Sequence, residues 1–198
     1  MKKLFYVFRH GQTDLNAAGV WQGVKLNPPL NQTGEEQAAS LGKKLLPLGI
    51  QAIYTSNLVR AKQTSLIVSR FVRVPMYIVD DLQECNFGDA EGMKMTEVEK
   101  LNPELMYNIL HPRPETWHLK FSGKDSESKK EVFARVSKRL REIAKNCQET
   151  TIGISTHGGV MSSLLSGLQA YDVELPNCCV AKIKYDEATD SLSFVGMI

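Results

Sequence analysis

The sequence predicts an α/β fold, in which helices cover both faces of a mostly parallel central sheet in a three-layer α/β/α arrangement. Two observations lead to this prediction. Short apolar runs bounded by turn residues alternate along the chain with longer segments that have a helical period. Strands covered on both faces have continuous apolar runs, and parallel strands need a crossover, usually a helix, between them. The length of 198 residues suits one domain, residues 1–198.

The first half of the chain contains three expected strands and two expected helices. The strands are residues 4–8, 50–55 and 76–79. Thr33 and Glu36 form a capping-box pattern, which predicts a helix with Thr33 as its N-cap that ends near residue 47. Ser56 or Asn57 is expected to cap a second helix, which continues to about residue 71. The β-loop-α-β-α-β order favours a parallel sheet.

The second half begins with an irregular stretch. Short helices are expected at residues 96–101 and 104–110, whereas residues 111–125 show no period. Because such segments are typical of lids and binding loops, residues 93–125 are expected to be a lid that sets specificity. The remaining expected elements are a helix at 126–147, a strand at 150–155, a short helix at 160–168 and a hairpin with strands 179–185 and 191–195. The basic face of the 126–147 helix is expected in solvent: Lys129, Lys130, Lys138, Arg139 and Arg141.

Composition and charge argue against several classes of function. A hydrophobic content of 42% and a charged content of 23% are ordinary for globular proteins. The net charge of +2 is too small to indicate nucleic acid or a membrane surface as partner. No apolar run approaches the length of a membrane span, and the N-terminal run is too short for a secretory signal. The four cysteines lack metal-site spacing, which favours reduced thiols in a cytoplasmic protein.

Two expected strands, far apart in the sequence, each end in a histidine followed by glycine. The first continues into Arg9-His10-Gly11, and the other leads to His157-Gly158. The carboxyl ends of parallel strands meet at one edge of a sheet, so the two imidazoles are expected to meet there. The glycines after each histidine would let backbone N–H groups approach a ligand closely. The N-terminus of a helix that begins after Gly159 would favour binding of an anion. One such histidine is usually structural, but two in matching turns indicate an anion site.

Five segments then carry a family resemblance, and they occur in the order that the family has. Arg9-His10-Gly11-Gln12-Thr13 with Asn16 resembles the Arg-His-Gly signature of the histidine phosphatase superfamily, branch 1, which includes cofactor-dependent phosphoglycerate mutases. The other four segments are similar to later motifs of that family: residues 30–38, 56–64 and 82–92, and His157-Gly158-Gly159. The resemblance covers nearly the whole chain and implies the phosphoglycerate mutase-like fold.

The resemblance also implies roles for single residues. His10 would attack phosphorus through an unprotonated ring nitrogen and form a phosphohistidine, while a backbone carbonyl holds its other ring N–H. Arg9 and Arg60 would hold phosphoryl oxygens. Glu84 would protonate the leaving oxygen and then activate water. Further phosphate contacts are expected from Gly11, Asn16, His157 and Gly158. No metal and no cofactor is expected, because Arg and His meet the phosphate charge.

Alternatives stay open for two of these residues and for the reaction. Arg60 could be a surface charge, and Glu84 has acidic neighbours at Asp80, Asp81, Asp89 and Glu91. Hydrolysis of a phosphomonoester is the expected reaction, since Gln12-Thr13 stand where the family's mutases have Glu-Ser. The middle segment also lacks paired arginines and offers only His111, Arg113, His118, Lys120 and Lys124. Phosphoglycerate mutase activity is the second interpretation, and non-catalytic binding of a phospho-ligand is the third.

The expected substrate is a small phosphorylated metabolite. Sugar phosphates, phosphoglycerate, nucleotides and phosphopeptides all stay open. Residues 111–124 either select the substrate or form a surface loop anchored by Trp117. A further hypothesis is that Cys85, next to Glu84, makes the activity sensitive to oxidants.

Overall fold

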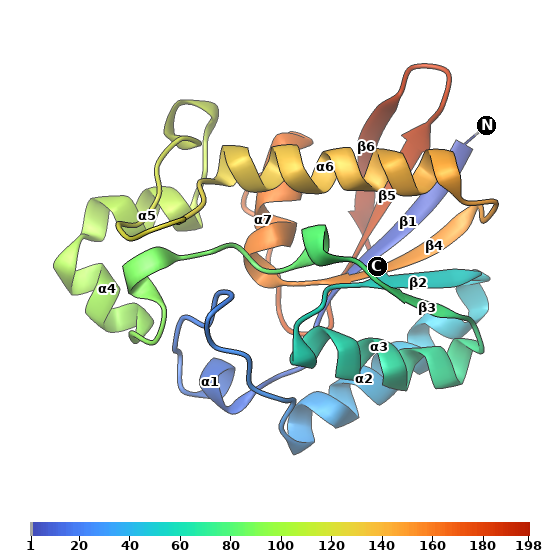
Figure 1. Cartoon of the computed structure of the whole chain (residues 1–198), viewed down its shortest axis with the longest axis horizontal. Helices are drawn as coiled ribbons and strands as arrows, with labels where there is room; N and C mark the ends of the chain where they lie inside the picture. Colours follow the sequence, from blue (N-terminus) through green and yellow to red (C-terminus); the bar gives the residue numbers. More distant parts are fainter. Residues whose placement is uncertain (1) are drawn as a thin grey trace.

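Six strands form one mixed sheet at the centre of the computed structural model, which describes residues 2–198 (Figure 1). Their order is β3-β2-β4-β1-β5-β6. β3, β2, β4 and β1 run parallel, whereas β5 and β6 are antiparallel additions at one edge. The strands are β1 (Lys2–Arg9), β2 (Ala52–Thr55), β3 (Met76–Ile78), β4 (Thr151–Thr156), β5 (Val180–Asp186) and β6 (Ser191–Met197).

Helices cover both faces of this sheet, which confirms the predicted three-layer α/β/α arrangement (Figure 1). Phe5 and Val7 of β1 pack in the core beneath α6 and α7, whereas the alternate residues Tyr6 and Phe8 pack in the core beneath α2 and α3. This is why the β1 run is continuously apolar. The helices are α1 (Asp14–Ala17), α2 (Gln32–Leu45), α3 (Val59–Val72), α4 (Met95–Leu101), α5 (Pro103–Leu110), α6 (Lys129–Asn146) and α7 (Gly158–Gly167).

The α4–α5 pair lies beyond the carboxyl ends of β1 and β4 (Figure 1). Backbone bonds tie the start of this pair to the loop that follows α1. Trp21 N–H donates to the Met93 carbonyl at 3.0 Å, and Met95 N–H donates to the Gly19 carbonyl at 2.8 Å. Residues 111–128, with a 3₁₀ turn at Pro114–Thr116, connect α5 to α6. No helix within residues 2–198 has the length and apolarity that a membrane crossing requires.

Three local predictions are wrong. Asn31 rather than Thr33 caps α2, because its side chain accepts the Gly34 N–H at 2.9 Å. Ser56 and Asn57 were the expected N-caps of α3, but its N-cap residue is Leu58, which makes no side-chain cap bond. Lys129 is only 8% exposed, so it does not belong to the solvated face of α6. It lies three residues before the buried Val132 and shares the apolar stripe of the helix.

Candidate active site

The two histidine turns lie side by side because their strands are neighbours. β1 and β4 pair in parallel with Arg9 opposite Thr156, so His10 and His157 leave the sheet at the same edge. Their ring centroids are 5.1 Å apart, and the residues are 2% and 0% exposed. The predicted meeting of the two imidazoles is confirmed.

Hydrogen bonds fix the tautomer of His10. Nδ1 lies 2.6 Å from the Gly11 carbonyl oxygen and donates its hydrogen there. Nε2 accepts a hydrogen bond from Arg60 Nε at 3.2 Å, so it carries a lone pair rather than a proton. Burial, and then the positive charges of Arg60 and Arg9, lower the pKa of His10 well below its ordinary value. The ring is therefore held in the form that a nucleophile requires.

Two guanidinium groups, those of Arg60 and Arg9, line the same cavity as His10. Arg60, in the first turn of α3, is 1% exposed, and its terminal nitrogens donate to the carbonyls of Leu26 at 3.1 Å and Gly23 at 2.8 Å. Arg9 donates to the Leu175 carbonyl at 2.6 Å, while its Nε is buried without a partner. Burial lowers the pKa of both side chains, and that of Arg60, at about 10, leaves its guanidinium charged at neutral pH. Arg60 is not a surface charge.

His157 presents a second buried donor without a partner. Its Nε2 lies 2.8 Å from Ser56 Oγ, which itself accepts the Leu58 N–H at 3.2 Å. The Ser56 hydroxyl hydrogen is free to donate to Nε2, and in the tautomer that makes this bond the ring hydrogen lies on Nδ1. His157 Nδ1 and Arg9 Nε are both buried and without partners. Since buried donors are normally satisfied, this pair indicates a site for an anion.

Glu84 is held by backbone N–H groups. Its Oε1 accepts from Cys85 at 2.8 Å and Val160 at 3.1 Å, and its Oε2 accepts from Gly159 at 3.1 Å. Two of these donors belong to the first turn of α7, where the helix dipole favours a negative charge. A Cβ at Gly159 would lie 2.7 Å from Glu84 Oε1, so the close approach requires glycine.

None of the other acids of this region lines the cavity described below, and three of them have partners elsewhere. Asp81 pairs with Arg139 on α6, and Asp80 accepts from Asn57. Glu91 accepts backbone N–H groups from both the loop after α1 and the segment after Glu84. Of the five acids that the sequence offered, Glu84 is therefore the one that lines the cavity.

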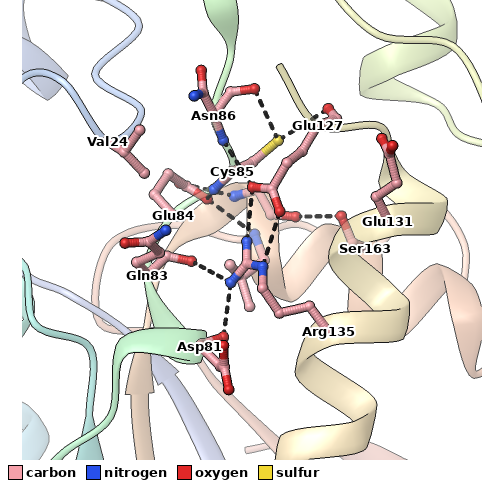
Figure 2. A network of polar contacts seen from close by, with 12 residues as sticks. Val24, Asp81, Gln83, Glu84, Cys85, Asn86, Glu127, Glu131, Arg135 and Ser163 are labelled. Atoms are coloured by element: carbon pink, nitrogen blue, oxygen red, sulfur yellow. Dashed lines mark hydrogen bonds and ion pairs between the residues drawn. The ribbon is translucent and has the colours of Figure 1, made fainter. Parts of the chain in front are cut away.

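Arg135 of α6 fixes the segment that carries Glu84 (Figure 2). Its guanidinium makes two bonds of 2.9 Å to Glu127 and donates to the carbonyls of Asp81 at 2.7 Å and Gln83 at 3.2 Å. Sequence reasoning missed Arg135, because nothing in the pattern separates it from the other basic residues of the helix. It is a positioning residue for Glu84.

Cys85 lies on the same segment (Figure 2), but it does not have the environment of a reactive thiol. It is 4% exposed, and burial raises the pKa of its thiol well above the ordinary value. A protonated, buried thiol is inert, so the hypothesis of oxidant sensitivity is not supported.

A cavity of about 270 Å³ lies beside His10. Six of the predicted site residues line it: Arg9, His10, Asn16, Arg60, Glu84 and Gly158. The rest of the wall is mainly apolar, from Val20, Trp21, Phe87, Met95, Ile109, Leu110, Val173 and Leu175. Sequence reasoning missed three polar lining residues, Gln22, Lys129 and Ser162. Within residues 2–198, no three His, Cys, Asp or Glu side chains are grouped so that they could hold a metal ion.

Some of the expected residues do not line the cavity. The Gly11 N–H, from which a phosphate contact was expected, donates to Thr64 Oγ1 at 3.0 Å, and Gly11 does not line the cavity. A Cβ there would lie 2.4 Å from the Gly34 carbonyl oxygen, which explains the glycine. His157 is fully buried and is not among the residues of the wall, but its ring lies next to that of His10, which does line the cavity.

Residues 111–125 also stay outside the cavity. Arg113 pairs with Asp172 at 2.6 Å on the surface, and Trp117 packs against Phe133 with ring centroids 5.6 Å apart. These contacts match the surface loop with an anchored tryptophan rather than a selectivity loop.

The two buried imidazoles predict that stability falls in acid. Because the pKa values of folded His10 and His157 lie well below 6.5, the unfolded chain binds more protons than the folded chain below about pH 6.5. The free energy of unfolding then decreases as the pH falls, by up to about 1.4 kcal/mol per histidine per pH unit. Urea unfolding at pH about 7.5 and about 5.5 measures this loss.

In that measurement, the free energy of unfolding of His157→Asn should decrease less at the lower pH than that of the wild type. His118→Asn, which removes an exposed imidazole, should lose as much as the wild type. Equal losses in all three proteins would show that His157 is not held neutral.

Comparison with known proteins agrees with this geometry. The sequence profile of the histidine phosphatase superfamily (branch 1) matches residues 5–196. A relative from Bacillus subtilis (strain 168), named "Uncharacterized phosphatase PhoE", is 32% identical over 184 residues, which are 90% of this chain and 86% of the relative. A "Metal-independent phosphoserine phosphatase" of Arabidopsis thaliana is 33% identical over 161 residues, 79% of this chain and 64% of that protein.

A solved structure described as phosphoglycerate mutase from Bacillus anthracis str. Sterne superposes with a TM-score of 0.83. It is 24% identical, and the match covers 98% of this chain and 92% of that one, which shows the shared fold. Because the family profile spans nearly the whole sequence, the expected family is confirmed. The chain belongs to branch 1 of the histidine phosphatase superfamily.

Proposed function

We propose that the chain is a phosphoric monoester hydrolase that transfers a phosphoryl group first to His10 and then to water. The observation that carries this proposal is the hydrogen bonding of His10, whose Nδ1–H is held by Gly11 and whose Nε2 lone pair lies beside Arg60. Membership of the family supports it, as do relatives that are named phosphatases.

In the first step, a phosphoryl oxygen takes over the Arg60 Nε hydrogen bond and frees the lone pair of His10 Nε2. Nε2 attacks phosphorus, the bond to the leaving oxygen breaks, and Glu84 protonates that oxygen. Arg9 Nε and His157 Nδ1, which have no partner in the protein, donate to the other phosphoryl oxygens.

In the second step, water attacks phosphorus while Glu84 accepts a proton from it. The P–N bond breaks, His10 returns to its neutral form, and inorganic phosphate leaves. Asn16 and the Gly158 N–H, both at the cavity wall, add donors for the phosphate oxygens.

Release of inorganic phosphate from p-nitrophenyl phosphate without added metal tests the proposal. We expect turnover, because two guanidinium groups neutralise the phosphoryl charge. Absence of turnover across the pH range would favour the non-catalytic binding alternative.

The mutase alternative needs a separate assay with 3-phosphoglycerate and a bisphosphoglycerate primer. Phosphate release is expected to exceed isomerisation, because Arg113, the single arginine of residues 93–125, pairs with Asp172 outside the cavity, so no paired arginines reach the substrate. Isomerisation faster than phosphate release would favour a mutase.

Glu84→Gln should slow the hydrolysis of alkyl phosphates by about 10²- to 10⁴-fold, because their leaving oxygen needs a proton. With p-nitrophenyl phosphate, whose leaving group needs none, a pre-steady-state burst of nitrophenol should persist while turnover becomes slow. Stopped-flow absorbance measures the burst. Glu99→Gln, at an exposed position of α4, is the matched control and should behave as the wild type. If the burst and the turnover fell together, Glu84 would not be the acid.

A small phosphorylated metabolite fits the cavity as substrate, since about 270 Å³ is near the lower end of ligand-binding pockets. The relative named for phosphoserine supports this class. A lid was expected at residues 93–125. We propose that its α4–α5 part covers the cavity, because Met95, Ile109 and Leu110 line it. The four cysteines are free thiols, which supports a reducing, cytoplasmic location.

A further inference from the structure

We propose that Lys129 makes the enzyme select phosphomonoesters whose leaving group carries a carboxylate. This inference rests on the proposed phosphatase function of the same cavity and adds the class of substrate. It comes from a buried cation that the reaction at His10 does not use.

Lys129 is the first residue of α6, and its side chain extends into the protein. Nζ donates to Ser162 Oγ on α7 at 2.8 Å, and both residues line the cavity that also contains His10. Across residues 2–198 this is the only hydrogen bond of the ammonium group, and Lys129 forms no ion pair there. Burial lowers the pKa of Lys129, which reflects how poorly the charge is compensated.

The acidic groups near Lys129 do not satisfy its charge. Glu84 and Cys85 are the acidic groups that influence it. The Glu84 oxygens are occupied by three backbone N–H groups, and burial keeps the Cys85 thiol protonated. An ammonium group has three donors, so two of them lack a protein acceptor. A buried cation is unfavourable unless it is paired, and a ligand anion in the cavity would pair it.

The chemistry of the wall favours a carboxylate as that anion. Arg9 and Arg60 stand at His10, whereas the remaining wall is mainly apolar. One carboxylate balances the single charge of Lys129, and its two oxygens match the two free N–H donors. A second phosphate dianion would exceed that charge, and a neutral hydroxyl would leave the cation unpaired. The geometry therefore points to an organic acid phosphorylated on a hydroxyl group.

Matched substrates test this inference. Phosphoglycolate and 3-phosphooxypropanoate provide a carboxylate at two distances from phosphorus, and their carboxamides are neutral partners of nearly the same shape. For at least one length, the wild type should prefer the acid by about 10- to 100-fold in kcat/KM. Lys129→Met should remove the preference by raising KM for the acid, with kcat/KM for the amide changed less than about threefold. Lys130→Met, at the exposed neighbouring residue, should keep the preference.

Each other outcome has a definite meaning. Equal rates for wild type on acids and amides, or a preference that persists in Lys129→Met, would overturn the inference. An equal loss on both substrates would also overturn it, since Lys129 would then only support the structure of the site. If Lys129→Met does not fold, Lys129→Gln replaces it, and inhibition of the wild type by non-hydrolysable phosphonates with an acid or an amide tests selectivity without a variant. Failure of wild type on every ester, p-nitrophenyl phosphate included, would instead reject the phosphatase function itself.

Discussion

His10→Ala should abolish phosphomonoester hydrolysis, with kcat reduced by about 10⁴-fold or more. The substitution removes the proposed nucleophile, whose attacking lone pair is held in place by the hydrogen bonds to Gly11 and Arg60. The remaining donors would still bind phosphate, because Arg9, Arg60 and His157 are unchanged. Steady-state release of phosphate measures the loss.

His118→Ala is the matched control for this substitution, because it removes an exposed imidazole from the loop before α6. It should retain the wild-type kcat. Thermal unfolding of His10→Ala separates a catalytic loss from a loss of fold. Normal phosphatase activity in a folded His10→Ala would overturn the mechanism.

Arg60→Ala should lower kcat by about 10²- to 10³-fold, the usual effect of losing one preorganised donor to a developing charge. Arg60 is held in place by the carbonyls of Gly23 and Leu26, and its Nε already points to the nitrogen that attacks phosphorus. Arg60→Lys should recover only part of the loss, because lysine lacks the planar fork whose three separate nitrogens reach His10 Nε2 and both carbonyls at once.

Arg70→Ala removes an exposed arginine from the same helix and should leave kcat unchanged. Inhibition by vanadate, measured for both variants, reports on the phosphoryl site. If Arg60→Ala kept wild-type kcat and vanadate affinity, Arg60 would have no role in binding the phosphoryl group.

The sheet and the two histidine turns were predictable from the sequence because their signals are local. An apolar run that ends in a histidine turn marks both the strand and its carboxyl end, and parallel strands bring such ends to one edge of the sheet. The direct pairing of β1 with β4, with Arg9 opposite Thr156, was known only from the structure. Helix starts were less predictable, since Asn31 and Thr33 are both capable caps and only the tertiary structure selects Asn31.

The missing part of the site comes from contacts between distant elements. Gln22 lies in a loop without a period, and Ser162 looks like any small residue of an apolar helix. Lys129 did carry a signal, because it occupies the same stripe as Val132 and Val136 at helical spacing. A lysine in an apolar stripe predicts a buried ammonium, and this feature outweighs its resemblance to neighbouring surface lysines.

At Gly11 and in residues 111–124, residue type alone did not separate a substrate contact from a structural role. Glycine next to a catalytic histidine suggested an N–H for the phosphate, but close packing against Gly34 explains it. The basic and aromatic residues at 111–124 left substrate contacts and a surface loop both open, whereas in the structure Arg113 pairs with Asp172 and Trp117 packs against Phe133 outside the cavity. Residue type alone did not show which way these groups face.

Trapping the phosphoenzyme tests the central claim most directly. Acid quenching would destroy phosphohistidine, so labelled substrate is mixed with the enzyme and quenched in alkali within the first turnover, and the labelled peptide is mapped by mass spectrometry. The proposed mechanism predicts an alkali-stable, acid-labile phosphoryl group on Nε2 of His10 that disappears as inorganic phosphate is released. Label on another residue, or hydrolysis that proceeds without any phosphoenzyme, would contradict it.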